Sequence, residues 1–415
     1  MENEKRNFFA FNWHAFWLAL AQTFADKNTV LPGLILFAGG TQLEIGLLTS
    51  IMIGIPMISQ LLFASYLTRK PLKKHFLLLG IYMRVIAFAG VVLSLSSLET
   101  SNPDFIIYSV FAWMFLFSIS GAFAGVSYTD ILGKSITGET RKRFFVFRQF
   151  LSSLGVLISA LVVRFILREL EYPQNYIIMF SAASALLFIA TFGFLMIKER
   201  PSEVKKTPES LLTILRSIPS IIKKDGNLRN LVISINLLAI SFTLIPFYVS
   251  LVKSNFTLDK TTIGNFLLLQ IIGMIISNLF WMKLTKSKGF KGIFRIAIIL
   301  YALLPIIALL FVSFLPMEYF GIVFLVVGAS ISAYKISGES ILIEISNENN
   351  RPLYTGIYGT FNLTMSVFPL IIGLLLAYLG FYVIFIVSSM LTISALYFLR
   401  KMECPIDKVN KLQNL

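Results

Sequence analysis

The chain has 415 residues, of which 56% are hydrophobic and only 14% charged, and its mean hydropathy is +0.80. A water-soluble protein of this length cannot bury so much apolar surface, which excludes a soluble multidomain enzyme and favours a protein whose solvent is lipid. In a soluble protein the formal net charge of +15 would suit a nucleic-acid partner. Here the basic residues gather at the ends of apolar segments, so we expect no nucleic-acid partner.

Twelve apolar segments follow one another, each near or above the roughly 20 residues that a helix needs to cross about 30 Å of hydrocarbon. Strands are excluded because runs such as Ile177 to Ile197 lack period-two alternation and because lipid cannot satisfy open sheet edges. The predicted fold class is an all-α membrane protein. Its twelve transmembrane helices are expected at residues 8–37, 43–68, 75–98, 103–129, 143–167, 174–197, 229–252, 261–284, 291–314, 318–345, 351–379 and 380–400.

A long polar stretch from Lys198 to Leu228 interrupts these segments in the middle of the chain. Between Leu211 and Ile222, apolar residues recur at helical spacing while basic and hydroxyl side chains occupy the other face. This pattern predicts an amphipathic helix, which we interpret as a tether on anionic lipid; a lipid-sensing lever is the alternative. The chain then divides into an N-terminal six-helix half (1–197), a cytoplasmic connector (198–228), a C-terminal six-helix half (229–400) and a cytoplasmic tail (401–415).

Basic residues cluster in the loops after the second and eighth spans, whereas the loops on the opposite side are acidic or sparse in charge. An excess of Lys and Arg marks the cytoplasmic side of a membrane. An even number of spans places both termini on that side, in what we expect to be a bacterial inner membrane. The basic residues are Arg69, Lys70, Lys73 and Lys74 in the first loop and Lys283, Lys286, Lys288 and Lys291 in the second.

The two halves also share short sequence echoes. LTRKPLKK at Leu67–Lys74 and LTKSKGFK at Leu284–Lys291 occupy matched junctions between the second and third helix of each half. A weaker echo pairs Gly138–Arg148 with Glu348–Tyr358. Duplicated halves in parallel orientation predict a pseudo-two-fold axis along the membrane normal and a binding site between the halves.

Over essentially its whole length the chain resembles the major facilitator superfamily, in its twelve spans, its central connector and its basic loops. The family's loop after span two usually reads Gly-x-x-x-Asp-Arg-x-Gly-Arg-Arg; here Ala64 stands at the first Gly, Thr68 at the Asp and Arg69 at the Arg. In the second copy Thr285 stands at the Asp and Lys286 at the Arg, so both copies lack the acidic residue. The resemblance implies two pseudo-symmetric six-helix bundles, with helices one, four, seven and ten lining a central cavity.

Asp26 lies within the first span, on a helix that the resemblance places beside the cavity. Gln22 and Thr29 share its face at helical spacing, and lipid does not favour such a polar stripe. A charge within a span costs several kcal/mol and therefore needs a reason. We interpret Asp26, together with Gln22, as a protonatable group that couples transport to protons or binds the solute. The alternative is a structural ion pair with Lys27 or Lys335.

Lys335 and Glu339 stand at i and i+4 on span ten, where Lys335 either binds an anionic solute or is neutralised by Glu339, which we favour. Asn236 on span seven is a further candidate for solute contact. Arg84, on a helix that the resemblance places at the periphery, is interpreted as structural, paired with a neighbour or snorkelling to the interface.

Several polar or aromatic residues lie on helices that we expect at the cavity or where the two halves meet. Interhelical hydrogen bonds are the simple interpretation of the polar ones, with solute contact as the alternative. These residues are Trp113, Gln60, Gln149, Gln270 and Asn362.

Charged residues also gather where spans four and five reach the cytoplasm. Asp130 and Arg148 are the predicted pair of a cytoplasmic gate, to which Arg141 and the loop residue Arg69 are assigned. Ordinary membrane-end charge is the alternative interpretation.

These observations together predict a secondary active transporter that moves a small organic solute by alternating access, as a proton-coupled symporter or antiporter. The alternatives are a proton-driven multidrug exporter and a receptor or scaffold of the same fold that transports nothing. We expect no enzyme and no cofactor, because two distant histidines, the single Cys404 and the lack of a Gly-x-Gly-Asp motif leave no catalytic constellation. The expected partners are the lipid bilayer, a small solute and a proton, and we expect a monomer.

Overall fold

The computed structural model describes residues 2–67, 69–97, 102–136, 138–201, 211–346, 354, 357–359 and 362–403, and all regular secondary structure within these ranges is helical. The chain divides into two compact units. Unit 1 comprises Met1–Glu44, Ile51–Pro208 and Asp259–Leu268, and unit 2 comprises Ile45–Ser50, Glu209–Leu258 and Leu269–Leu415.

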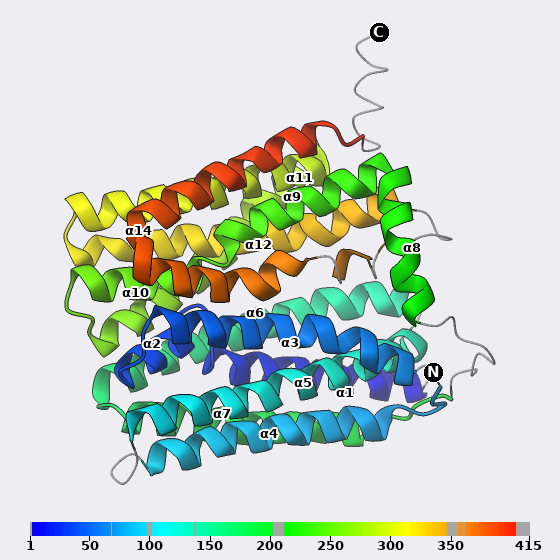
Figure 1. Cartoon of the computed structure of the whole chain (residues 1–415). Helices are drawn as coiled ribbons and strands as arrows, with labels where there is room; N and C mark the ends of the chain where they lie inside the picture. Colours follow the sequence, from blue (N-terminus) through cyan, green and yellow to red (C-terminus); the bar gives the residue numbers. More distant parts are fainter. Residues whose placement is uncertain are drawn as a thin grey trace. The chain divides into compact units, whose positions relative to one another are not determined.

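Unit 1 is a bundle of long helices (Figure 1). Within it α4 packs against α5 and α7, and α1 packs against α6 and α7. Gly80 of α4 lies so close to α5 that a Cβ there would come within 2.8 Å of the Ser120 carbonyl oxygen. Small residues permit such close helix contacts inside a membrane. The helices are α1 (Glu2–Thr23), α2 (Val30–Phe37), α3 (Gln42–Leu67, of which Ile45–Ser50 belong to unit 2), α4 (Lys74–Ser96), α5 (Pro103–Ser135), α6 (Gly138–Glu169) and α7 (Gln174–Leu195).

Unit 2 contains the connector helix α8, which turns away from the direction of α9 at Asp225 (Figure 1). Its α9 packs along α14 and also contacts α12 and α8. The first residues of α11 belong to unit 1. The remaining elements are α8 (Leu211–Lys224), α9 (Gly226–Phe242), α10 (Ile245–Asn255), α11 (Lys260–Phe314), the 3-10 helix η2 (Met317–Phe320), α12 (Gly321–Ile345) and α14 (Leu363–Arg400).

Within the described residues, nine helices are long and apolar enough to cross a membrane. Two of them contain a left-handed glycine, Gly289 in α11 (φ 64°) and Gly380 in α14 (φ 70°), which interrupts the helix. Glycine adopts positive φ without steric cost, so the chain can leave the helical conformation at these two positions. Each of the two helices therefore holds two of the predicted spans. The all-α membrane fold is confirmed, and the predicted boundary between the last two spans falls at Gly380.

Two predicted spans are not continuous helices. The first is divided into α1 and α2 by residues 24–29, and the seventh into α9 and α10 at Thr243 and Leu244. At the first break the Asp26 side chain accepts backbone N–H bonds that a continuous helix would use internally. At the second, Pro246 lacks the N–H that a continuing helix would need.

The same two contacts occur in each half of the chain. In unit 1, Asn7 donates to the Lys198 carbonyl and accepts from its N–H, both at 3.0 Å. In unit 2, Asn227 does the same with Glu403, at 3.1 and 3.0 Å. Lys74 likewise donates to the Ile197 carbonyl, and Lys291 to the Met402 carbonyl. We name the two asparagine contacts the Asn clasps. They tie the start of the first helix of a half to the residue that follows its last helix.

Replacing Asn7 by alanine is expected to destabilise the protein by about 1–3 kcal/mol, because two partly buried backbone groups lose their partners. For Asn227 we expect about 1 kcal/mol, because its two hydrogen bonds are exposed and water can replace them. Thermal unfolding of purified Asn7→Ala and Asn227→Ala measures this. The matched control is Asn255→Ala, whose exposed amide only donates to Leu251 within its own helix. The two effects should add, because the clasps lie in different units. An unfolding temperature unchanged from wild type in both variants would show that the clasps carry no stability.

Candidate functional site

Arg84 is a buried cation in the interior of unit 1. Its position on α4 leaves it 8% exposed, and its Cζ lies 4.1 Å from the centroid of the Phe117 ring on α5. The Nε has no hydrogen-bond partner, and no carboxylate of the described residues forms an ion pair with this guanidinium. The ring of Phe117 is therefore its described neighbour, and no described ion pair with a carboxylate supports the structural interpretation of Arg84.

Two glycines lie one turn apart on α5, the first of them against this guanidinium. A Cβ added to Gly125 would meet no heavy atom of a neighbouring element within 4 Å. At Gly121, one turn earlier, the three nearest atoms belong to Arg84, at 3.5 to 3.8 Å. Gly121 therefore makes room for the Arg84 side chain of α4, and Gly125 faces a position that no neighbouring atom covers.

Two further basic side chains lie in the same bundle. His14 on α1 is 4% exposed, stacks against Phe194 of α7 with ring centroids 3.9 Å apart, and has its Nδ1 3.3 Å from the Ala190 carbonyl oxygen. The Arg148 guanidinium of α6 lies 5.5 Å from the centroid of the Tyr128 ring. A planar guanidinium binds carboxylates and phosphates through two parallel hydrogen bonds, so this region is suited to an anion.

Asp26 lies in the break between α1 and α2. Its Oδ1 accepts hydrogen bonds from the Asn28 N–H (3.0 Å), the Thr29 N–H (3.0 Å) and the Thr29 hydroxyl (2.9 Å). The carboxylate thereby holds the turn that starts α2. Gln22, one turn before it, is exposed.

In unit 2, Asn236 connects two helices. Its Oδ1 accepts from the Thr364 hydroxyl at 2.8 Å and from the Thr364 N–H at 3.2 Å, which joins α9 to the start of α14. Lys335 is exposed on α12. The side chain of Glu339 lies outside the part of the chain that the structure describes, so the ion pair between Lys335 and Glu339 stays a prediction.

The predicted cavity or interface residues take varied positions. Trp113 packs on Gly90 and donates to the Ser94 hydroxyl at 3.1 Å, which places it between α5 and α4. Gln60 and Gln149 are exposed, and Gln149 donates to Ser153 at 3.3 Å. Gln270 and Asn362 are buried.

At one end of unit 1 four charged side chains form an ion-pair cluster. Asp130 pairs with Lys73 and with Lys134, both at 2.8 Å, and Lys134 also pairs with Glu199 at 2.9 Å. Glu199, with a side chain only 3% exposed, also accepts from the backbone N–H groups of Lys73 and Lys74 at the start of α4. The cluster joins α4, α5 and the exit of α7. An acidic residue within a basic segment directly after a span was the sequence signal for Glu199.

The remaining predicted gate residues have other contacts. Arg148 lies over Tyr128. Arg141 donates to the carbonyls of Gly133 (2.6 Å) and Ile136 (2.9 Å), and so caps the end of α5. Arg69 is exposed.

Comparison with known proteins gives matches of two kinds. Residues 230–412 match the family model of the Major Facilitator Superfamily. No curated protein matches the chain. Among solved structures, a POT family transporter in complex with a thioalcohol-conjugated peptide is similar, with 12% identity and a TM-score of 0.73, covering 95% of each chain.

Two further solved structures have comparable similarity. A POT family transporter in complex with 5-aminolevulinic acid has 13% identity and a TM-score of 0.71, covering 95% of this chain and 96% of that one. The nucleoside transporter NupG has 14% identity and a TM-score of 0.63, covering 97% and 100%. Identities this low establish a shared fold over almost the whole chain, and nothing about the solute.

Proposed function

We propose that this chain, which has the major facilitator superfamily fold, is a secondary active transporter whose solute carries an anionic group. The observation that carries the proposal is the buried Arg84 guanidinium, which lies against Gly121, one helical turn from the uncovered position Gly125, and has no carboxylate partner among the described residues. The protein moves its solute across a cell membrane by alternating access, as a monomer with both termini cytoplasmic.

The energetic argument concerns the cost of Arg84. A buried charge without a partner destabilises a bundle by several kcal/mol. An anionic solute would neutralise the guanidinium and restore its hydrogen bonds when it binds. The Arg148 guanidinium favours an anion as well, because it adds a second positive charge to unit 1.

Transport in reconstituted liposomes tests the proposal. An imposed proton gradient should drive uptake of a labelled carboxylate or phosphate ester from a panel that also contains sugars, nucleosides and cationic drugs. Selective flux of cationic drugs would instead indicate a multidrug exporter. A receptor or scaffold would show neither solute flux nor solute-dependent alkalinisation.

Asp26, with Gln22 beside it, is the proposed coupling site. Its three hydrogen-bond donors sit at the α1–α2 break, where a change of protonation would release the turn that begins α2. Asp26→Asn should retain solute exchange between equal pools and lose proton-driven accumulation. The matched control is Asp259→Asn, an exposed carboxylate before α11. Undiminished proton-driven accumulation by Asp26→Asn would remove Asp26 from the mechanism.

Cytoplasmic gating is proposed for the two arginines outside the ion-pair cluster. Lys73, Asp130, Lys134 and Glu199 hold α4, α5 and the exit of α7 together as one body. Arg148 and Arg69 take no part in the described ion pairs, so they are the candidates for contacts that form and break during transport. Arg141 caps the carboxyl end of α5.

A further inference from the structure

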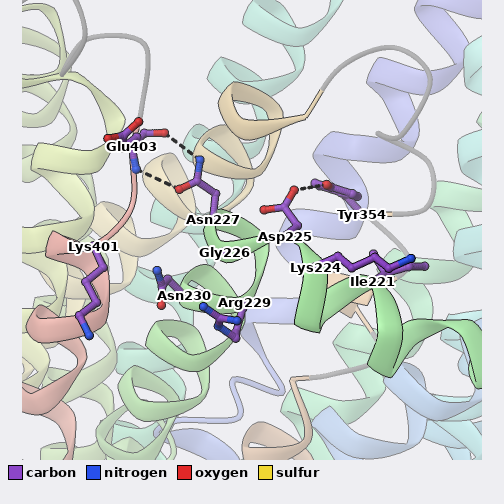
Figure 2. A pocket seen from close by; sticks show the side chains of 10 residues that line it. All are labelled: Ile221, Lys224, Asp225, Gly226, Asn227, Arg229, Asn230, Tyr354, Lys401 and Glu403. Atoms are coloured by element: carbon purple, nitrogen blue, oxygen red, sulfur yellow. Dashed lines mark hydrogen bonds between the residues drawn. The ribbon is translucent and has the colours of Figure 1, made fainter.

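A hollow of about 770 Å³ lies in unit 2 where the connector helix α8 meets α9 (Figure 2). The end of α14 and Tyr354 complete its walls. Its lining residues are Ile221, Lys224, Asp225, Gly226, Asn227, Arg229, Asn230, Tyr354, Lys401 and Glu403.

Hydrogen bonds hold the walls of this hollow in place. Asp225 accepts from the Leu228 N–H at 2.9 Å, which caps α9, and the Tyr354 hydroxyl donates to its other oxygen. Asn227 clasps the backbone of Glu403, as Figure 2 shows. The Asp225 carboxylate is therefore engaged within the wall of the hollow.

Three cations line the hollow, and none forms an ion pair within the described residues. Arg229 donates to the Lys223 carbonyl at 3.3 Å, Lys401 donates to the Tyr397 hydroxyl at 2.6 Å, and Lys224 is exposed. The atom nearest to a Cβ added at Gly226 would be Nη2 of Arg229, at 3.8 Å. The guanidinium thus borders space that any other residue at this position would fill.

Asn230 is the second and independent sign of a ligand. It lines the hollow, is only 8% exposed, and its side-chain amide has no hydrogen-bond partner within the described residues. Its amide atoms are therefore available to a molecule that occupies the hollow. Asn230 follows Arg229 directly in α9, and both residues line the hollow (Figure 2).

We propose that this hollow binds a phosphate ester, with the phosphate oxygens accepting from Arg229, Lys401 and the Asn230 amide. The ligand chemistry is shared by an anionic phospholipid headgroup and by a soluble phosphate. Its place at the α8–α9 joint means that occupancy would set the direction of α8, whose Ile218 is buried while Lys223 and Lys224 are exposed. The site is separate from the proposed solute-binding arginine, and it stands whether or not the chain transports an anion.

Direct binding to the purified, delipidated full chain tests this proposal. The soluble probes are inorganic phosphate and glycerol 3-phosphate, and the lipid probes are vesicles of phosphatidylcholine with or without phosphatidylglycerol. Arg229→Gln and Asn230→Leu should each weaken binding about tenfold or more, the effect of losing a charge-assisted or buried hydrogen bond. Lys286→Gln removes an exposed charge elsewhere in unit 2 and should leave binding unchanged.

The two variants separate a ligand site from a structural one. Asn230 has no protein partner to lose, so Asn230→Leu should unfold at or above the wild-type temperature while losing the ligand. Saturable binding of the soluble phosphates identifies a free phosphate ligand, and binding confined to phosphatidylglycerol vesicles identifies a lipid headgroup. The proposal is overturned if no probe binds, or if Arg229→Gln and Asn230→Leu bind as the wild type does.

Discussion

Replacing Arg84 by methionine is expected to abolish transport of the anionic solute and to raise the unfolding temperature of the protein. Methionine fills a similar volume without a charge, so the variant removes the cost of a buried, unpartnered guanidinium. Replacing buried charged groups by apolar ones of similar volume stabilises some proteins by about 1–4 kcal/mol. Loss of the solute's main anchor should reduce transport at least about a hundredfold, since a bidentate charge-assisted contact contributes about 3 kcal/mol or more.

A rise in unfolding temperature together with a loss of transport in Arg84→Met distinguishes a solute-binding arginine from a structural one. Arg84→Lys keeps the charge but not the paired donors, and should raise the KM for the solute while keeping part of the maximal rate. Arg168→Gln is the matched control, because Arg168 is exposed and pairs only with the adjacent Glu169 in the described structure. Wild-type transport by Arg84→Met, or a fall in its unfolding temperature, would mean that Arg84 serves the fold and not the solute.

Replacing Glu199 by alanine is expected to destabilise the protein by about 3–5 kcal/mol, the cost of removing one partner from a buried ion pair. The side chain is 3% exposed, pairs with Lys134 at 2.9 Å and caps the start of α4. Its removal leaves a cation and backbone N–H groups without their acceptor. Glu199→Gln keeps an acceptor oxygen, so it should lose less stability than alanine.

Thermal unfolding in detergent measures the Glu199 effect. Glu169→Ala is the matched control, because this carboxylate is exposed and pairs with a sequence neighbour, which predicts a change of less than about 1 kcal/mol. An unfolding temperature for Glu199→Ala that matches the Glu169→Ala control would show that the ion-pair cluster does not hold α4 to α5 and α7.

Much of the fold could be predicted because lipid acts on each segment separately. A chain segment in hydrocarbon must satisfy its own backbone hydrogen bonds, so a long apolar run can only be a helix. That reasoning located α4, α7 and α12 closely, and it placed the boundary between the last two spans at Gly380. The connector helix α8 followed from periodicity alone.

The helix breaks were harder to predict from the sequence. Asp26 reads as a polar residue within a continuous span, and only the structure shows its carboxylate taking two backbone N–H bonds from the start of α2. Competition between a side chain and the helix for the same N–H groups depends on the conformation of a few residues, which hydrophobic patterning does not specify.

The ion-pair partners of residues that lie far apart in the chain could not be predicted either. Asp130 was assigned to Arg148, but its described ion pairs are with Lys73 and Lys134, and Glu199 completes the cluster. The sequence shows which charges lie near a membrane end, but not which of them meet when α4, α5 and α7 pack.

By itself the amino-acid sequence determined that this protein is helical and has the composition of a membrane protein, because both properties are sums over local apolar surface. Tertiary structure alone decided which charges have partners. Arg84 and Glu199 are both buried ions in unit 1, yet Arg84 has no carboxylate partner among the described residues, while Glu199 pairs with Lys134 and accepts backbone N–H bonds. That difference arises from the relative positions of helices far apart in the chain, where a shift of a few ångströms makes or removes an ion pair.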